Sequence, residues 1–231
     1  MPRRLAISDI HGCLKTFKAL LDRVSLGTTD ELYLLGDFVD RGPRTAQVLD
    51  YVIKLQAEGY RIHPLRGNHD QYMLDAILIG DKHSRNVWRN AGANTTKKSY
   101  VKRGKQGGQI DPIHIAWLSE LPYYYLLDDY VLVHAGLNFR RKNPLKGKKA
   151  MLNRRNWYRQ IDYDWLGDRK IVHGHTPMKR EQIEAQTRPR RRVYPVFDID
   201  AGCFHTKPGM GHLCAFNLDE RTFTFVANRD R

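Results

Sequence analysis

The feature that most constrains this chain is a pattern that occurs three times within its first seventy residues. Each time, a short apolar run is followed by a loop with aspartate, glycine or histidine and then by an amphipathic stretch. The runs are residues 5–7, 32–35 and 62–65, and the stretches begin near Cys13, Arg44 and His69. Strands that alternate with helices predict a parallel sheet with right-handed crossovers, and therefore an α/β fold. The first amphipathic stretch, residues 13–24, has apolar residues at helical spacing and is expected to bury one face.

Residues suited to metal binding fall in five short segments, each directly after an apolar run. The segments are D-I-H-G (residues 9–12), G-D-F-V-D-R-G (36–42), G-N-H-D (67–70), H-A-G (134–136) and H-G-H-T (173–176). Ligand sites in such sheets lie beyond the carboxyl ends of the strands, so these side chains are expected to converge. Aspartate, asparagine and histidine supply the oxygen and imidazole ligands that manganese, iron or zinc accept.

The rest of the chain changes in character after residue 80. Residues 80–120 predict an insertion over the site, with helices around 84–91 and 112–119 on either side of a basic loop at 102–109. Runs at 123–127 and 130–133 predict paired strands, and further strands are expected at 170–172, 193–199, 212–217 and 222–226, the last two as a hairpin. Residues 138–149 are the best candidate for a mobile loop.

Length and composition limit the class of protein. With 231 residues, 41% of them hydrophobic, the chain is expected to form one compact unit over residues 1–231. No apolar run approaches the eighteen residues that span a bilayer, and the start of the sequence lacks an export signal, so we expect a cytoplasmic protein without a membrane partner. Three cysteines without a C-x-x-C pair predict neither a disulfide framework nor a cysteine zinc site.

The net charge of +14 is unusual for a small enzyme, and such a field attracts phosphorylated or acidic partners. The excess is local: residues 82–110 and 138–155 each carry eight lysines or arginines and no acids, and four arginines lie within 188–192. Two interpretations stay open, namely solvated loops and a rim that attracts phosphate or RNA. No nucleic-acid-binding motif accompanies these clusters.

Taken together, the series D-x-H-G, G-D-x-V-D-R-G, G-N-H-D, H-A-G and G-H-T resembles the calcineurin-like metallophosphoesterases, and within them the branch of bacterial and phage serine/threonine phosphatases. Residues 88–100 also resemble the insertion of the bacterial members. The resemblance implies a β-sandwich flanked by helices in four αββα layers, which some schemes class as α+β, with a small helical insertion. It further implies two divalent metal ions, most often manganese, with iron or zinc as alternatives.

The resemblance also assigns roles to individual residues. Its implied metal ligands are Asp9 and His11 for the first ion, Asp37 as the bridge, and Asn68, His134 and His175 for the second. His173 has no counterpart in the motif and is expected to be structural.

Four further residues are implied in catalysis. His69 would protonate the leaving oxygen, and Asp40 would hold its other ring nitrogen. Arg41 would bind the phosphoryl oxygens in a bidentate manner. A second arginine is expected before the last histidine; Arg154 matches best, and Arg155 stays open.

Three functions compete. The preferred one is hydrolysis of phosphoserine or phosphothreonine in proteins, with phosphotyrosine as a further option; small phosphoesters would be turned over as well. The second is hydrolysis of dinucleoside polyphosphates or of RNA caps, and the third is binding of a phosphorylated ligand without catalysis. Asp40 favours the protein phosphatases, whereas Asp70, in place of the usual glutamate, resembles the nucleotide hydrolases. The oligomeric state stays open.

Overall fold

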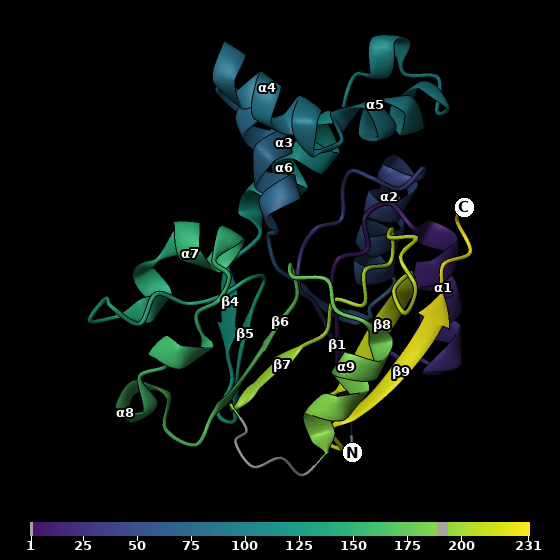
Figure 1. Cartoon of the computed structure of the whole chain (residues 1–231). Coiled ribbons are helices and arrows are strands. Elements are labelled where there is room, and N and C mark those ends of the chain that lie inside the picture. The colour runs from purple at the N-terminus through teal and green to yellow at the C-terminus, as the bar shows by residue number, and fades with distance from the viewer. Residues whose placement is uncertain (1, 189–193) are drawn as a thin grey trace.

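The computed structural model describes residues 2–188 and 194–231, which form two sheets flanked by helices (Figure 1). The first sheet has the strand order β3-β2-β1-β8-β9 and the second the order β4-β5-β6-β7. The strands of the first sheet are β1 (Arg4–Ile7), β2 (Glu31–Leu34), β3 (Arg61–Pro64), β8 (His212–Asn217) and β9 (Thr222–Ala227). Those of the second are β4 (Tyr124–Leu126), β5 (Tyr130–Val133), β6 (Lys170–His173) and β7 (Val196–Asp198). The expected sandwich of sheets flanked by helices is confirmed.

The three strand–loop–helix units form the parallel part of the first sheet. Strands β1, β2 and β3 pair in parallel, and they are followed by α1 (Leu14–Arg23), α2 (Thr45–Ala57) and α3 (Asn68–Leu78). Strand β8 then pairs with β1 in antiparallel orientation and continues into β9 as a hairpin. The sheet is therefore mixed, because the carboxy-terminal hairpin adds to the edge that the parallel strands leave open.

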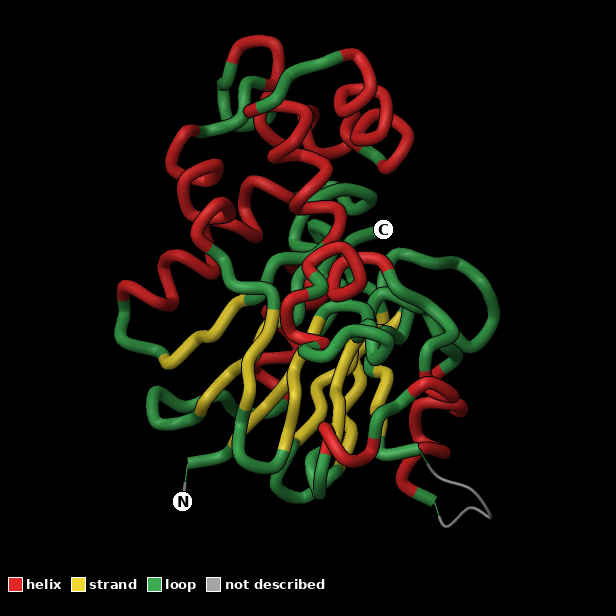
Figure 2. The backbone as a smooth tube through the Cα atoms, turned by 90° about the vertical axis from the view of Figure 1, so that its left-hand side faces the viewer, coloured by secondary structure: helices red, strands yellow, loops and turns green. Residues whose placement is uncertain are grey.

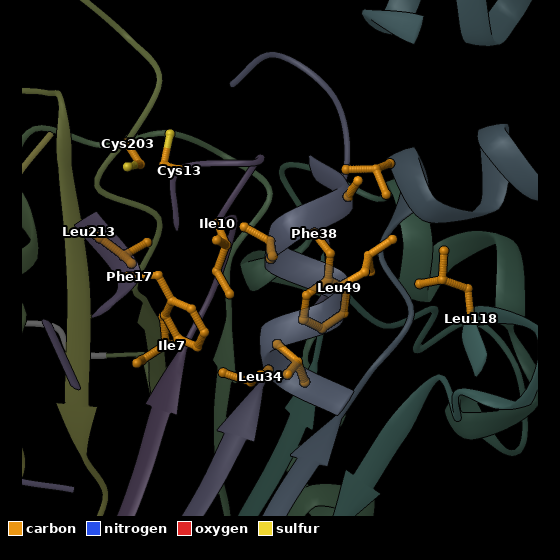
Figure 3. Close-up of a cluster of buried hydrophobic side chains, with 14 of the residues drawn as sticks. Ile7, Ile10, Cys13, Phe17, Leu34, Phe38, Leu49, Leu118, Cys203 and Leu213 are labelled. Atoms are coloured by element: carbon orange, nitrogen blue, oxygen red, sulfur yellow. The ribbon is translucent and has the colours of Figure 1, made fainter. Parts of the chain in front are cut away.

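Alternation of side chains along the strands divides the core. Ile7 and Leu34 point to the helices, where they pack with Phe17 of α1 and Leu49 of α2 (Figure 3). Ala6, one residue from Ile7, belongs instead to the cluster between the two sheets. Successive residues of a strand face opposite sides of the sheet, so each short apolar run contributes side chains both to the layer under the helices and to the layer between the sheets.

The second sheet is buried on both faces in the same way. Tyr130 and Leu132 pack between the sheets, whereas Val131 and Val133 face an outer cluster that includes Trp157. Three short helices belong to this half of the molecule: α7 (Lys148–Asn153), α8 (Tyr163–Leu166) and α9 (Arg180–Glu184). Trp157 is fully buried in this outer cluster.

The segment expected as an insertion is helical. It contains α4 (Lys82–Ala91), α5 (Ala93–Val101), a 3₁₀ turn (Gln106–Gly108) and α6 (Pro112–Glu120). With α3, these helices gather beyond one end of the strands (Figure 2). The predicted helices around 84–91 and 112–119 are confirmed, but α5 was not expected. Its sequence, A-N-T-T-K-K-S-Y-V, has no apolar stripe, because it buries threonine, serine and tyrosine.

The remaining strand predictions agree with the structure to within one residue, except at the start of β7. Strand β7 is shorter than the predicted 193–199, and Val193 lies outside the described residues. Residues 138–149 include a 3₁₀ turn (Pro144–Lys146) and the start of α7, while the mobility expected there stays a prediction. Among the described residues, no helix combines the length and the apolar character that a membrane span requires.

Candidate metal centre

The polar loops of both sheets meet at the ends of their strands. Asp9 and His11 follow β1, Asp37 follows β2, and Asn68 is the first residue of α3 after β3. His134 and His175 come from the second sheet, directly after β5 and just beyond β6. The structure thus brings together all six residues that the sequence predicted as ligands, from five separate loops.

Two groups of side chains place possible ligand atoms within 4.8 Å of one another. One consists of His11, Asp37 and His69, and the other of Asp37, His134 and His175. The Nε2 atom of His11 lies 3.5 Å from one carboxylate oxygen of Asp37, and that of His134 lies 3.6 Å from the other. Asp37 therefore stands between the two groups, as a bridging carboxylate must.

Asp9 and Asn68 extend the two groups. A carboxylate oxygen of Asp9 lies 3.9 Å from His11 Nε2, and the other accepts a hydrogen bond from the His175 backbone N–H at 2.9 Å. The Oδ1 atom of Asn68 lies 2.9 Å from His134 Nε2 and 2.8 Å from His175 Nδ1. Each group thus contains both oxygen and imidazole donors, a set that suits divalent manganese, iron or zinc.

His11 shows directly that this centre fits a cation. Its Nδ1 lies 2.8 Å from the carbonyl oxygen of Val39, which can only accept, so the ring proton sits on Nδ1. Its Nε2 is buried and has no hydrogen-bond partner. Burial, together with His69 and Arg41, lowers the pKa of His11 well below its usual range, so the neutral ring presents a lone pair to the centre. A lone pair buried without a donor is what a metal ligand requires.

The carboxylates agree with this conclusion. Burial raises the pKa of Asp37 well above its usual range, and the charge of Asp9 adds to the effect, although His69 opposes it. A divalent cation would favour the charged form of Asp37 and reverse this shift. For His175, burial and the nearby His134 and Arg155 lower the pKa to about 2, so this imidazole is also neutral and able to act as a ligand.

His69 is engaged through both of its ring nitrogens. Its Nδ1 lies 2.9 Å from a carboxylate oxygen of Asp40, and its Nε2 lies 3.0 Å from the guanidinium of Arg41. Burial acts to lower the pKa of His69, but the charge of Asp37 and the bond to Asp40 outweigh it, and the pKa is raised. A histidine held by a buried carboxylate, with a raised pKa, is suited to donate a proton to a leaving group.

The helical insertion holds the other side of Asp40. The second carboxylate oxygen of Asp40 accepts hydrogen bonds from the Thr96 hydroxyl at 2.7 Å and from the Trp88 indole N–H at 3.0 Å. The backbone N–H of Asp40 donates to the same hydroxyl at 3.0 Å. All three side chains are buried. Helices α4 and α5 therefore fix the carboxylate that orients His69, a role for Trp88 and Thr96 that no motif in the sequence indicated.

The backbone of the centre is unusual. Nine non-glycine residues in the described chain have positive φ angles, and six of them are expected site residues: Asp9, His11, Asp37, Asp40, Arg41 and His175. Such conformations cost energy in L-residues and cluster at functional sites. Two glycines allow the loops to approach closely: a Cβ on Gly67 would lie 2.2 Å from Asp37 Oδ1, and one on Gly174 would lie 2.2 Å from Asp9 Oδ2.

Asp70 secures two of these loops together. Its buried carboxylate accepts hydrogen bonds from the backbone N–H groups of Asp37 and Gly67, both at 2.9 Å, and of Phe38 at 3.0 Å. Burial raises its pKa, while these bonds oppose the shift. Asp70 thus supports the loop that carries Asp37, which explains its place in the motif without a direct role in catalysis.

The second arginine differs from the preferred prediction. Arg154 points away and donates to the Gln160 side chain at 2.6 Å, whereas the guanidinium of Arg155 donates to the His175 carbonyl at 3.2 Å. The chain is extended at Arg154, just after α7, and neighbouring side chains of an extended segment point in opposite directions. Arg155, the alternative, is therefore the arginine that lies beside the centre.

His173 is not part of either group, as expected. Its Nδ1 lies 2.8 Å from the Gly174 carbonyl oxygen, and the Tyr158 hydroxyl lies 2.6 Å from its Nε2. With both nitrogens engaged by protein atoms, His173 stabilises the strand end beside His175.

Comparison with known proteins decides the family. The model of the calcineurin-like phosphoesterases matches residues 2–205. This chain belongs to the calcineurin-like phosphoesterases. The phosphoesterase is 28% identical over 225 residues to the asymmetrical bis(5'-nucleosyl)-tetraphosphatase PrpE of Anoxybacillus flavithermus, covering 85% of this chain and 84% of that one. It is 34% identical over 134 residues to the symmetrical bis(5'-nucleosyl)-tetraphosphatase of Aromatoleum aromaticum, covering 57% of this chain but only 43% of that enzyme.

Solved structures share the fold at lower identity. A proposed diadenosine tetraphosphatase has a TM-score of 0.66 at 18% identity, covering 100% of this chain and 97% of the other. A protein serine/threonine phosphatase from Saccharomyces cerevisiae has a TM-score of 0.60 at 15% identity, covering 97% and 79%. At these identities the likeness shows the fold and leaves the substrate open.

Proposed function

We propose that this phosphoesterase binds two divalent metal ions and hydrolyses bis(5'-nucleosyl) tetraphosphates or closely related nucleoside polyphosphates. The observation that carries the proposal is the convergence of six side chains able to bind metal, with a buried histidine lone pair that has no other partner. Support for this substrate class comes from relatives that carry the name bis(5'-nucleosyl)-tetraphosphatase and match as much as 95% of this chain. Asp70 also supports this substrate class, because an aspartate at this position, in place of the usual glutamate, resembles the nucleotide hydrolases.

The proposed ligands are the members of the two groups other than His69, together with Asp9 and Asn68. Asp9 and His11 would bind one ion, Asn68, His134 and His175 the other, and Asp37 both. When bound, two such ions would supply positive charge for the phosphoryl oxygens and an activated water as nucleophile. Manganese is the proposed metal, with iron or zinc as alternatives.

The proposed catalytic residues surround this centre. His69 would give a proton to the leaving oxygen, and Asp40 would keep the imidazole in the required orientation. Arg41 and Arg155 would bind phosphate oxygens from two sides, since their guanidinium groups lie against His69 and His175 respectively. In the absence of substrate, Arg41 contacts His69 itself and would exchange this contact for the phosphate.

A second candidate is hydrolysis of phosphoserine or phosphothreonine in proteins. The observation that favours it is the Asp40–His69 pair, which the insertion holds so firmly. An alkoxide is a poor leaving group and needs a proton in the transition state, whereas a nucleoside phosphate leaves readily as an anion. A well-built proton donor is therefore of greater use to an enzyme that acts on phosphomonoesters.

One set of assays separates the two candidates. The protein is stripped with a chelator, reconstituted with Mn²⁺, Fe²⁺ or Zn²⁺, and supplied with diadenosine tetraphosphate, phosphoserine peptides or an aryl phosphate. We expect the highest kcat/KM with the tetraphosphate and no turnover in the stripped protein. A far higher kcat/KM with the peptides would reverse the choice of substrate. Absence of bound metal under every condition would contradict the centre itself.

The role of His69 has a separate test. His69→Asn removes the proton donor but none of the six proposed ligands, so turnover of phenyl phosphate, whose leaving group needs the proton, is expected to fall about a hundredfold or more while metal content stays the same. Metal content is measured by elemental analysis of the purified variant. Loss of metal would show that His69, which lies among the atoms of the first group, is a ligand instead.

A further inference from the structure

A cavity of about 640 Å³ opens next to the metal centre, on the side of Arg155. Its lining includes Tyr158, Thr176, Met178 and Tyr194, none of which has a role in the proposed chemistry. The volume lies within the range of pockets that hold small ligands and cofactors. The cavity is thus large enough for a nucleoside and has no assigned occupant.

Arg155 links the cavity to the centre. This residue lines the cavity, and its guanidinium donates to the backbone carbonyl of His175, a proposed ligand. Thr176, the next residue, lines the cavity as well, and so does His173. A molecule whose phosphate lies at the metal centre would therefore pass Arg155 to reach this space.

The walls of the cavity are aromatic. The rings of Tyr158 and Tyr194 are 5.8 Å apart between centroids, at an angle of 53°, and Trp157 packs edge-on against Tyr158 at 4.9 Å. The hydroxyl of Tyr158 is bonded to His173, which holds its ring in place, and Met178 adds a polarisable thioether. Aromatic faces fixed in this way suit stacking with a planar base.

The rim of the cavity is positive and the interior is not. Arg155 and Arg159 are exposed at the rim, and in the described part of the chain neither forms an ion pair with a carboxylate. Inside, the buried carboxyl group of Asp198 is the acidic group of the lining. Phosphates are therefore attracted to the rim, next to the metal centre, while an uncharged ring with amino groups suits the interior.

We propose that this cavity binds the base and ribose of one nucleotide of the substrate, while Arg155 contacts the phosphates that lead to the metal centre. The base would stack against Tyr194 and Tyr158, and purines, with the larger ring surface, would bind best. The inference rests on the proposed nucleotide substrate and names the part of the chain that would select it.

The test compares substrates with and without a base. Tyr194→Ala is expected to lower the ratio of kcat/KM for diadenosine tetraphosphate to kcat/KM for inorganic tripolyphosphate by about tenfold, because a stacking partner is lost. Tyr194→Phe, which keeps the ring, is expected to restore the ratio. Tyr163→Ala serves as the matched control, since Tyr163 is 56% exposed on α8 and does not line the cavity.

Direct binding separates this inference from the proposed function. Adenosine 5'-monophosphate is expected to bind the wild-type protein in calorimetry about tenfold more tightly than ribose 5-phosphate, and Tyr194→Ala is expected to abolish the difference. If the tetraphosphate is not hydrolysed but this preference exists and is lost in Tyr194→Ala, the proposed function is wrong, while the assignment of the cavity as a base site stands. If the tetraphosphate is hydrolysed while Tyr194→Ala keeps both the ratio of kcat/KM values and the tighter binding of adenosine 5'-monophosphate, the cavity is not the base site. An equal loss on all substrates would likewise overturn the inference.

Discussion

Replacement of Thr96 by valine tests how the insertion supports catalysis. The change keeps the shape of the side chain and replaces only the hydroxyl, by a methyl group, at the fourth residue of α5 and far from the proposed ligands in sequence. In the wild-type protein this hydroxyl donates to the Asp40 carboxylate at 2.7 Å and accepts from the Asp40 backbone N–H at 3.0 Å. The variant leaves that N–H without a partner and leaves the carboxylate oxygen with Trp88 alone.

The expected magnitudes follow from these two bonds. A hydrogen bond to a charged group contributes about 1.5–3 kcal/mol, and a buried group left unpaired costs a similar amount. We therefore expect the free energy of unfolding to fall by about 2 kcal/mol. If about 1.4 kcal/mol of this energy serves to orient the Asp40 carboxylate that holds His69, its loss raises the barrier of reactions that need the proton donor by the same amount. Turnover in these reactions then falls about tenfold, since 1.4 kcal/mol in a barrier is a factor of ten.

Two aryl phosphates measure the dependence on the proton donor. Phenyl phosphate has a poor leaving group and needs the proton, whereas p-nitrophenyl phosphate has a good one and needs it much less. Thr96→Val is expected to lower kcat about tenfold for phenyl phosphate and less than about threefold for p-nitrophenyl phosphate, with unchanged metal content. The control is Thr95→Val: its hydroxyl donates to the Gly92 carbonyl at 2.9 Å and does not contact Asp40.

Equal losses on the two aryl phosphates would refute the reasoning, because they would indicate general damage to the site. Full activity of Thr96→Val on phenyl phosphate would refute it as well, since the carboxylate would then need no support from the insertion.

Three further predictions concern other parts of the molecule. Arg155→Ala should raise KM for phosphate substrates about tenfold or more in steady-state assays. Arg154→Ala, which removes only a hydrogen bond to Gln160, should leave KM near the wild-type value. A raised KM in Arg154→Ala with an unchanged KM in Arg155→Ala would exchange the roles of the two arginines. Gly67→Ala should displace the Asp37 carboxylate, since the added Cβ would lie 2.2 Å from it, and elemental analysis should show loss of bound metal. The Arg3 hydrogen bonds lower the pKa of Asp30 to about 2, so Asp30 contributes stability that is present above its ordinary pKa and is lost as the pH falls toward 2. Asp30→Asn should therefore cost about 1 kcal/mol in urea unfolding at pH 7, allowing for solvent screening, and almost nothing near pH 2.

Much of the fold could be predicted because its signals are local. The alternation of apolar runs and amphipathic stretches identified β1 to β3 with the helices that follow them, and the run at 222–226 identified β9. Helix α5 could not be found in this way. It buries Thr96, Ser99 and Tyr100 and has no apolar stripe, so its signal lies in tertiary hydrogen bonds that a single sequence does not display.

The candidate site was predictable for a different reason. Its residues lie in motifs at strand ends, and strand ends share one edge of a sheet, so their convergence follows from topology. What the motifs did not contain is the direction of each side chain. Arg154 and Arg155 are equivalent in sequence, and only the extended backbone after α7 separates them. The roles of Trp88 and Thr96 depend on how the insertion packs against Asp40, which no short pattern encodes.

The left-handed backbone at Asp9, His11, Asp37 and His175 has a consequence for protein engineering. Glycine at any of these positions would relieve an unfavourable conformation worth about 1 kcal/mol in an L-residue while abolishing a proposed ligand. Selection for heat resistance alone would thus enrich inactive variants. A library of variants of this protein therefore has to be screened for turnover at every round of selection. The same reasoning predicts that descendants freed from catalysis would lose these four side chains before they lose the surrounding core.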